Sequence, residues 1–117
     1  MWYSYISTER DKENVILAQV TTDADSPWFA GHFPEDPILP GIAQLNMVTE
    51  TIAKVLGKNL LLQSVARIKF KKLIRPGDIL NIRAIAGNKE NHYSFSITSM
   101  KEEVCSGRLV LAPKMEL

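Results

Sequence analysis

The sequence contains one cysteine and two histidines, and it has no apolar run long enough to cross a membrane. One thiol cannot form an intrachain disulfide or a thiolate metal cluster, so we expect Cys105 to be a small core residue of a strand. The first residues, MWYSYISTERDKENV, lack the basic and apolar regions of a secretory signal. We therefore expect a cytoplasmic protein with no membrane span.

The chain has no large excess of positive or negative charge, since its net charge is +1. A balance of this kind argues against general nucleic-acid binding. The distribution is nevertheless uneven. Residues 13 to 50 contain six acids and no Lys or Arg, whereas five basic residues and no acid lie between positions 67 and 75: Arg67, Lys69, Lys71, Lys72 and Arg75. This run is either a solvated strand face or a patch that attracts an acidic partner or a phosphate.

The length and composition predict one globular domain over residues 1–117. With 45% apolar and 23% charged residues, the chain can bury a sizeable core, but 117 residues are too few for two ordinary domains. No metal or redox cofactor is implied.

The first half of the chain predicts a strand, a loop and a helix. Residues 14–22 are rich in β-branched and apolar side chains, which is typical of a strand. Prolines at positions 34, 37 and 40 make residues 28–40 a stiff, irregular loop. A helix is predicted from Pro40 to the residue before Gly57, and its apolar residues surround most of its circumference, as in a buried helix.

The second half predicts antiparallel strands. In residues 60–74, Ala66, Ile68 and Phe70 alternate with basic residues, which indicates one buried face, and a turn is predicted at residues 75–78. Further strands are expected at residues 79–87, 92–100 and 103–113, and their short links make them antiparallel neighbours. The fold class is therefore α+β, with an antiparallel sheet wrapped around one long buried central helix.

Two segments carry a family resemblance. GHFPEDPILPGIAQL, residues 31–45, resembles the active-site segment of the 3-hydroxyacyl-[acyl-carrier-protein] dehydratases, and RIKFKKLIRPGD, residues 67–78, resembles their following strand and turn. PILPGIAQL is similar to the dehydratase-like branch associated with aryl-polyene and related lipid pathways. The resemblance implies a hot-dog fold and a dehydratase of fatty-acid or related lipid biosynthesis that acts on acyl thioesters.

Dehydration of a 3-hydroxyacyl thioester needs a base, a donor to the thioester carbonyl and an acid for the departing hydroxyl. His32 suits the base, because a neutral imidazole titrates near ~6.5. The resemblance implies that the carbonyl of Ile38 helps to hold its tautomer. The backbone N–H of Gly41 suits the donor, because a helix start favours negative charge and glycine allows close approach.

The acid is where the sequence departs from the family. The resemblance implies Glu or Asp fourteen residues after the histidine, but that position is Asn46, whose amide has no proton to release near neutral pH. Asn46 could orient a water or hydroxyl, which suits a thioesterase or a non-catalytic acyl-binding module. Glu50, one helical turn later, is either a displaced acid with a pKa raised by burial or a partner of Thr49, Asn46 or a second subunit. Glu35 and Asp36 are nearby alternatives.

The resemblance also implies partners. We expect a homodimer or higher homo-oligomer in which His32 of one subunit faces Asn46 of the other. The substrate would be an acyl thioester on acyl carrier protein or CoA, with its acyl chain in an apolar tunnel along the helix and its carrier near the basic run. The residues expected to contact the substrate are Phe33, Pro40, Ile42, Arg67, Lys69 and Lys71.

Overall fold

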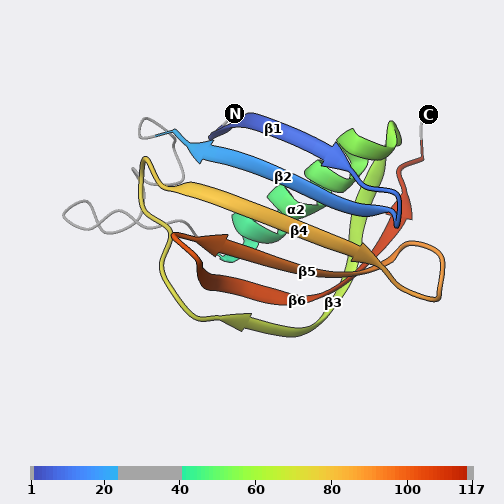
Figure 1. Cartoon of the computed structure of the whole chain (residues 1–117). Helices are drawn as coiled ribbons and strands as arrows, with labels where there is room; N and C mark the ends of the chain where they lie inside the picture. The colour runs from blue at the N-terminus through green and yellow to red at the C-terminus, as the bar shows by residue number, and fades with distance from the viewer. Residues whose placement is uncertain (1, 24–40, 116–117) are drawn as a thin grey trace.

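One helix and six strands make up the regular structure of the residues that the computed structural model describes, which are 2–23 and 41–115 (Figure 1). In chain order these elements are β1 (Tyr3–Arg10), β2 (Val15–Thr22), α2 (Gly41–Leu56), β3 (Leu60–Phe70), β4 (Ile79–Ala86), β5 (His92–Ser99) and β6 (Glu102–Pro113). The predicted loop, including His32, Phe33 and Pro40, lies outside the described residues.

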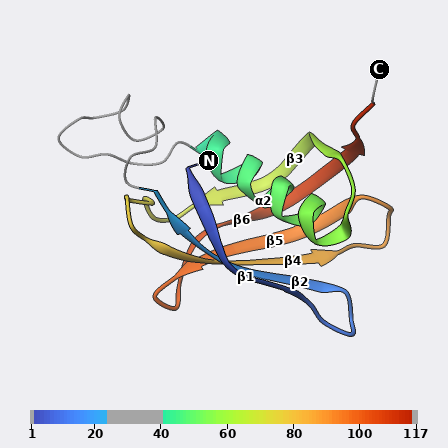
Figure 2. The same cartoon turned by 90° about the horizontal axis from the view of Figure 1, so that it is seen from above.

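The six strands form one antiparallel sheet in the order β1-β2-β4-β5-β6-β3. The sheet curves, and α2 lies across its inner face beside β3 (Figure 2). The strands β1 and β3 are therefore the two edges of the sheet. This arrangement confirms the predicted α+β class.

The inner face of the sheet forms the core together with α2. In β5, Tyr93, Phe95 and Ile97 are buried and alternate with more exposed residues, as their two-residue period predicts. Cys105 is also buried, and its burial raises the pKa of its thiol to about 12. The prediction that Cys105 is a small core residue is confirmed.

The helix ends where the sequence predicts. Gly57 has a φ of +65°, a left-handed conformation that glycine adopts without steric cost. The N–H of Lys58 donates to the carbonyl of Ala53 at 3.0 Å, and the N–H of Gly57 donates to that of Lys54 at 3.3 Å. These bonds satisfy carbonyls of the last turn in the manner of a Schellman motif.

The strand β1 was not predicted from the sequence. This strand pairs with β2, but its register shifts between Tyr5 and Ser7, and most of its residues after Tyr5 are exposed. An irregular, polar edge strand does not show the alternation that predicts a half-buried strand.

The predicted alternation of β3 is wrong. Arg67 has a left-handed φ of 55°, and the register with β6 shifts between Ala66 and Lys69. Ala66 is exposed and pairs with the exposed Arg108, whereas Ile68 packs over Gly107. The strand also ends at Phe70, before the turn in which the N–H of Arg75 donates to Asp78 at 2.9 Å. A β-bulge, invisible in the sequence pattern, places Ala66 and Ile68 on opposite faces.

Gly107→Ala should destabilise the protein by about 1–3 kcal/mol, because overpacking a filled core costs free energy of that order. A Cβ at position 107 would contact the Cδ1 atom of Ile68 closely and would lie 3.2 Å from the Cα of Ile68. Urea unfolding measures the change. Adding Ile68→Val, which removes Cδ1, should recover part of the loss, and an unchanged unfolding free energy in Gly107→Ala would show that the packing is looser than described.

Candidate active site

The described half of the candidate site begins at Gly41, the first residue of α2. A Cβ at this position would lie 2.6 Å from the Cζ atom of Phe70, so the aromatic ring packs directly over the glycine. Phe70 is itself 52% exposed, and its ring forms one side of an open surface. The first helical turn contains no acidic residue, so no side chain of that turn neutralises the positive end of the helix dipole.

A line of exposed residues runs along α2 on the side away from the core. Ile42, Asn46, Glu50 and Lys54 are exposed, while the residues between them are buried or half-buried. Their four-residue spacing places them on one helical face, which we call the exposed stripe. Asn46, the residue at the expected acid position, is therefore accessible from outside a single chain.

The two threonines of α2 do not belong to the exposed stripe. The hydroxyl of Thr49 donates to the carbonyl of Leu45 at 3.0 Å, and the hydroxyl of Thr51 donates to that of Met47 at 2.8 Å. Both side chains are buried. Of the alternatives for Glu50, pairing with Thr49 is wrong, because Thr49 satisfies its hydroxyl within the helix.

Glu50 is bound by β1. The hydroxyl of the buried Tyr3 donates to the Glu50 carboxylate, and the hydroxyl of Tyr3 lies 3.5 Å from that of Tyr5. The hydroxyl of Tyr5 in turn lies 3.1 Å from that of Thr51. Burial, followed by the hydrogen bond to Glu50, raises the pKa of Tyr3 well above its ordinary value, so Tyr3 remains a protonated donor. We call Tyr3, Tyr5, Glu50 and Thr51 the tyrosine cluster.

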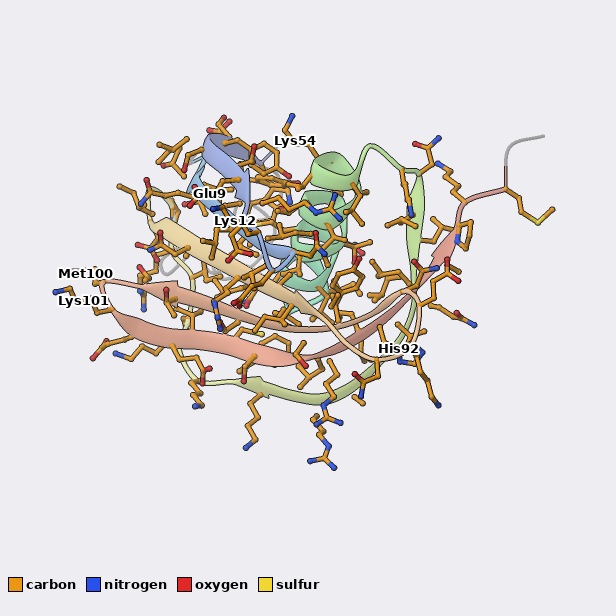
Figure 3. The ribbon with its side chains drawn as sticks, turned by 45° about the vertical axis from the view of Figure 1, so that its right-hand side comes forward. Glu9, Lys12, Lys54, His92, Met100 and Lys101 are labelled. Carbon is orange, nitrogen blue, oxygen red and sulfur yellow. The ribbon has the colours of Figure 1, made fainter. Side chains whose placement is uncertain are left out.

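Lys54 extends the tyrosine cluster along the stripe. Its Nζ atom lies 5.1 Å from the ring centroid of Tyr5, within the range of a cation–π interaction. The rings of Tyr3 and Tyr5 meet edge to face with their centroids 5.4 Å apart. Figure 3 shows Lys54 on the outward side of the helix, close to β1. Glu50 and Lys54 are thus held toward β1, whereas Gly41 lies beside the end of β3.

Two lysines of the basic run form ion pairs. Lys71 forms an ion pair with Glu103, and Lys72 forms one with Glu102. These acids come from β6. The fold therefore places carboxylates beside the basic run, although the run itself contains none. Arg67 and Lys69 line a hollow of about 400 Å³ that also includes Ser106 and Arg108.

The strand register places Lys69 on the outer face of the sheet. Lys69 pairs with Ser106, next to the buried Cys105 whose side chain points inward. The outer face is opposite to α2, so Lys69 does not lie beside Gly41 and Asn46. The described residues bring together Gly41, Ile42 and Phe70 at the helix start, with Asn46 one turn further along the stripe.

The sequence did not predict Phe70 beside Gly41 or Tyr3 beside Glu50. Phe70 was expected to face the core, and Tyr3 belongs to a strand that was not predicted. Within residues 2–23 and 41–115, no group of three or more His, Cys, Asp or Glu residues is placed to hold a metal ion. In the same ranges, no helix has the length and apolar character that a membrane crossing requires.

Comparison with known sequences finds dehydratases. The ApeI-like family, described as ApeI dehydratase, matches residues 8–108. The FabZ 3-hydroxyacyl-[acyl-carrier-protein] dehydratase of Rickettsia bellii (strain OSU 85-389) is 32% identical over 99 residues, which cover 77% of this chain and 68% of the relative. The FabZ of Chlamydia caviae is 31% identical over 112 residues, which cover 88% of this chain and 66% of the relative.

Comparison with solved structures finds the same fold. The dehydratase heterocomplex ApeI:P from Xenorhabdus doucetiae contains a similar chain, with a TM-score of 0.84 and 26% identity over 96% of this chain and 99% of that one. An uncharacterised Erwinia carotovora protein has a TM-score of 0.82 and 29% identity, over 99% of this chain and 100% of that one. The Escherichia coli PaaI protein, at 16% identity and a TM-score of 0.64 over 97% of this chain and 80% of that one, shows the fold alone.

In Tyr3→Phe, the free energy of unfolding should fall less steeply with alkaline pH than in the wild type. An unfolded tyrosine ionises near pH ~10, but the raised pKa of Tyr3 keeps the folded hydroxyl protonated. Above that pH only the unfolded state releases the proton, so the free energy of unfolding falls by about 1.4 kcal/mol per pH unit for such a group. Urea unfolding at a series of alkaline pH values measures the slope.

Glu50→Gln is the control for this slope. Because burial is the larger cause of the raised pKa, Glu50→Gln should retain most of the wild-type slope. A wild-type slope in Tyr3→Phe would contradict the assignment to Tyr3.

Proposed function

The chain belongs to the ApeI-like family of FabZ-related dehydratases, and from this membership we propose that it acts on 3-hydroxyacyl thioesters carried by acyl carrier protein in lipid biosynthesis. The matched residues 8–108 include both segments that resemble the dehydratases. The observation that carries the proposal is the open surface at the start of α2, where Gly41, Ile42 and Phe70 adjoin the exposed stripe.

The proposed reaction removes water across one carbon–carbon bond. His32 takes the proton from the carbon next to the thioester, and the electrons of that C–H bond form an enolate. The N–H of Gly41 donates to the thioester oxygen as charge develops there, supported by the positive end of α2. The C–O bond to the hydroxyl then breaks, the double bond forms, and the hydroxyl leaves as water once an acid has protonated it.

Asn46 cannot be that acid, because an amide has no proton to give. We propose that Asn46 holds a water or the departing hydroxyl, and that full dehydration uses an acid at the corresponding position of a second subunit. In this arrangement His32 of this chain faces residue 46, or its counterpart, across the interface. A pair of identical chains then has Asn in both sites, whereas a pair with an acid-bearing dehydratase has one complete site. The ApeI:P structure is itself a dehydratase heterocomplex, which supports this arrangement.

The second subunit is proposed to pair along β3. This edge strand has eleven residues, against eight for the other edge, β1. Leu61, Val65 and Phe70 of β3 are large exposed apolar residues, whereas β1 has one such residue, Ile6, and ends in charged residues. Register shifts interrupt both strands. A long, exposed, apolar edge strand is a template for pairing, and charged residues on an edge oppose pairing. Pairing along β3 is proposed to bring the Ile42–Asn46 end of the exposed stripe next to the partner.

Asn46→Asp should increase the hydration of an enoyl thioester, the reverse reaction, by about 10²- to 10⁴-fold, because general acid catalysis contributes factors of this order. A spectrophotometric assay of the enoyl double bond measures the rate. His32→Ala in the Asn46→Asp background should abolish the gain, and Glu50→Gln in the wild type should leave the rate unchanged.

Two results would contradict this assignment. If Asn46→Asp hydrates the enoyl thioester more slowly than the wild type does, the amide itself contributes to the reaction. If Glu50→Gln hydrates it more slowly than the wild type does, Glu50 is the displaced acid. Release of free thiol without hydration would make the protein a thioesterase. Co-purified acyl chains without either activity would make it a binding module.

Val65→Lys should shift the protein from dimer to monomer, because a lysine placed on an apolar edge strand opposes edge-to-edge pairing. Sedimentation velocity measures the change. Ser7→Lys on β1 is the matched control and should leave the dimer intact. Dissociation by Ser7→Lys but not by Val65→Lys would place the interface on β1 instead.

A further inference from the structure

A second hollow lies where the β4–β5 turn meets β3 and β6. Its volume is about 500 Å³. The residues that line it come from the turn and from three strands, and they are Ser64, Val65, Ala66, Gly87, Asn88, Lys89, His92, Tyr93, Ser94, Arg108, Leu109 and Val110. We call it the turn hollow. A volume of this size accommodates a small organic molecule.

The turn hollow is separate from the candidate active site. Tyr93 and Leu109 are buried in the core, so the residues that alternate with them in β5 and β6 face the other side of the sheet. These outward residues include His92, Ser94 and Arg108, and Ser94 pairs directly with Arg108. Because α2 covers the inner face, the turn hollow opens on the opposite face of the sheet from Asn46.

The turn hollow is basic and contains no acid. Lys89, His92 and Arg108 are among its lining residues, and no Asp or Glu is. Where the structure describes the chain, the ion pairs join Lys71 to Glu103 and Lys72 to Glu102, and neither Lys89 nor Arg108 takes part in one. Glu90 belongs to the same turn but does not line the hollow. Two cationic side chains, Lys89 and Arg108, at one concave surface favour a negatively charged ligand.

Backbone hydrogen bonds fix the turn that carries two of the three basic residues. The N–H of Gly87 donates to the carbonyl of His92 at 2.7 Å, and the N–H of His92 donates to the carbonyl of Lys89 at 3.2 Å. The N–H of Leu111 in β6 donates to the carbonyl of Asn91 at 2.9 Å. The turn is thus tied both to itself and to the neighbouring strand. A site held in this way loses little conformational entropy on binding.

We infer that the turn hollow binds a phosphate monoester, at a site distinct from the proposed dehydratase site. Arg108 offers the planar donor fork that matches a phosphate, and Lys89 offers a compact charge. The hydroxyls of Ser64 and Ser94 can donate to the remaining oxygens. Ala66 and Val110, which pair with the outward residues Arg108 and His92, provide apolar lining for the organic part of the ligand, which inorganic phosphate does not have.

Amide NMR spectra of the full chain, titrated with adenosine monophosphate, inorganic phosphate and adenosine, test the inference. Adenosine monophosphate should cause saturable shifts of the signals of Gly87, Lys89 and His92. The double variant Lys89→Gln, Arg108→Gln should bind adenosine monophosphate at least ~10-fold more weakly, because the loss of one modest charged contact lowers the affinity about tenfold. Both side chains are exposed, and the single variant Arg108→Gln provides a second measurement of the same loss.

Lys101→Gln is the matched control. It removes one positive charge from the β5–β6 turn, which lies at the opposite end of the sheet from His92 (Figure 3). Binding should be unchanged in this variant. Equally tight binding of inorganic phosphate would support the site and identify free phosphate as its ligand. The inference would be overturned by unsaturable shifts, by equal shifts with adenosine, or by equal weakening in Lys101→Gln.

Discussion

The packing of α2 against the inner face of the sheet is the interaction on which the other features depend. Met47, Val48 and Ile52 are fully buried and share one core with Leu80 and Ile82 of β4. Burying one such side chain contributes ~1.5–3 kcal/mol, so the rotation of the helix about its axis is strongly determined. Once this face is buried, the exposed stripe with Asn46 must point away from the sheet.

That constraint explains why Gly41 and Asn46, two residues of the proposed site, lie on an open face of one chain. Gly41 begins the helix beneath the ring of Phe70, and Asn46 lies one turn later on an open face. The neighbouring edge strand, β3, has exposed apolar residues and no further strand beside it in the described sheet. The tyrosine cluster holds Glu50 toward β1. A second subunit along β3 would therefore complete the site next to Asn46 and leave the tyrosine cluster on the other side.

Local patterns predicted the end of the helix at Gly57 and the strands β2, β4, β5 and β6, because a regular alternation or a glycine cap is visible in the sequence. They could not predict the bulge at Arg67, since nothing local shows that a basic residue adopts a left-handed conformation. The pairing of Lys71 and Lys72 with acids of β6 depends on strand register. For the proposed site, Gly41 and position 46 come from the resemblance and stay predictions, whereas Phe70 and Tyr3 are neighbours of the helix only through the fold.

The most direct measurement is subunit complementation. The double variant His32→Ala, Asn46→Asp carries an acid without the base, and the wild-type chain carries the base without the acid. Suppose that each site combines His32 of one subunit with residue 46 of the other. When equal amounts of the two proteins are refolded together, about half of the dimers are mixed, and each mixed dimer has one complete site of two. Enoyl hydration should therefore return to about a quarter of the Asn46→Asp rate. A mixture no more active than the sum of its separate components would contradict a site shared across the interface.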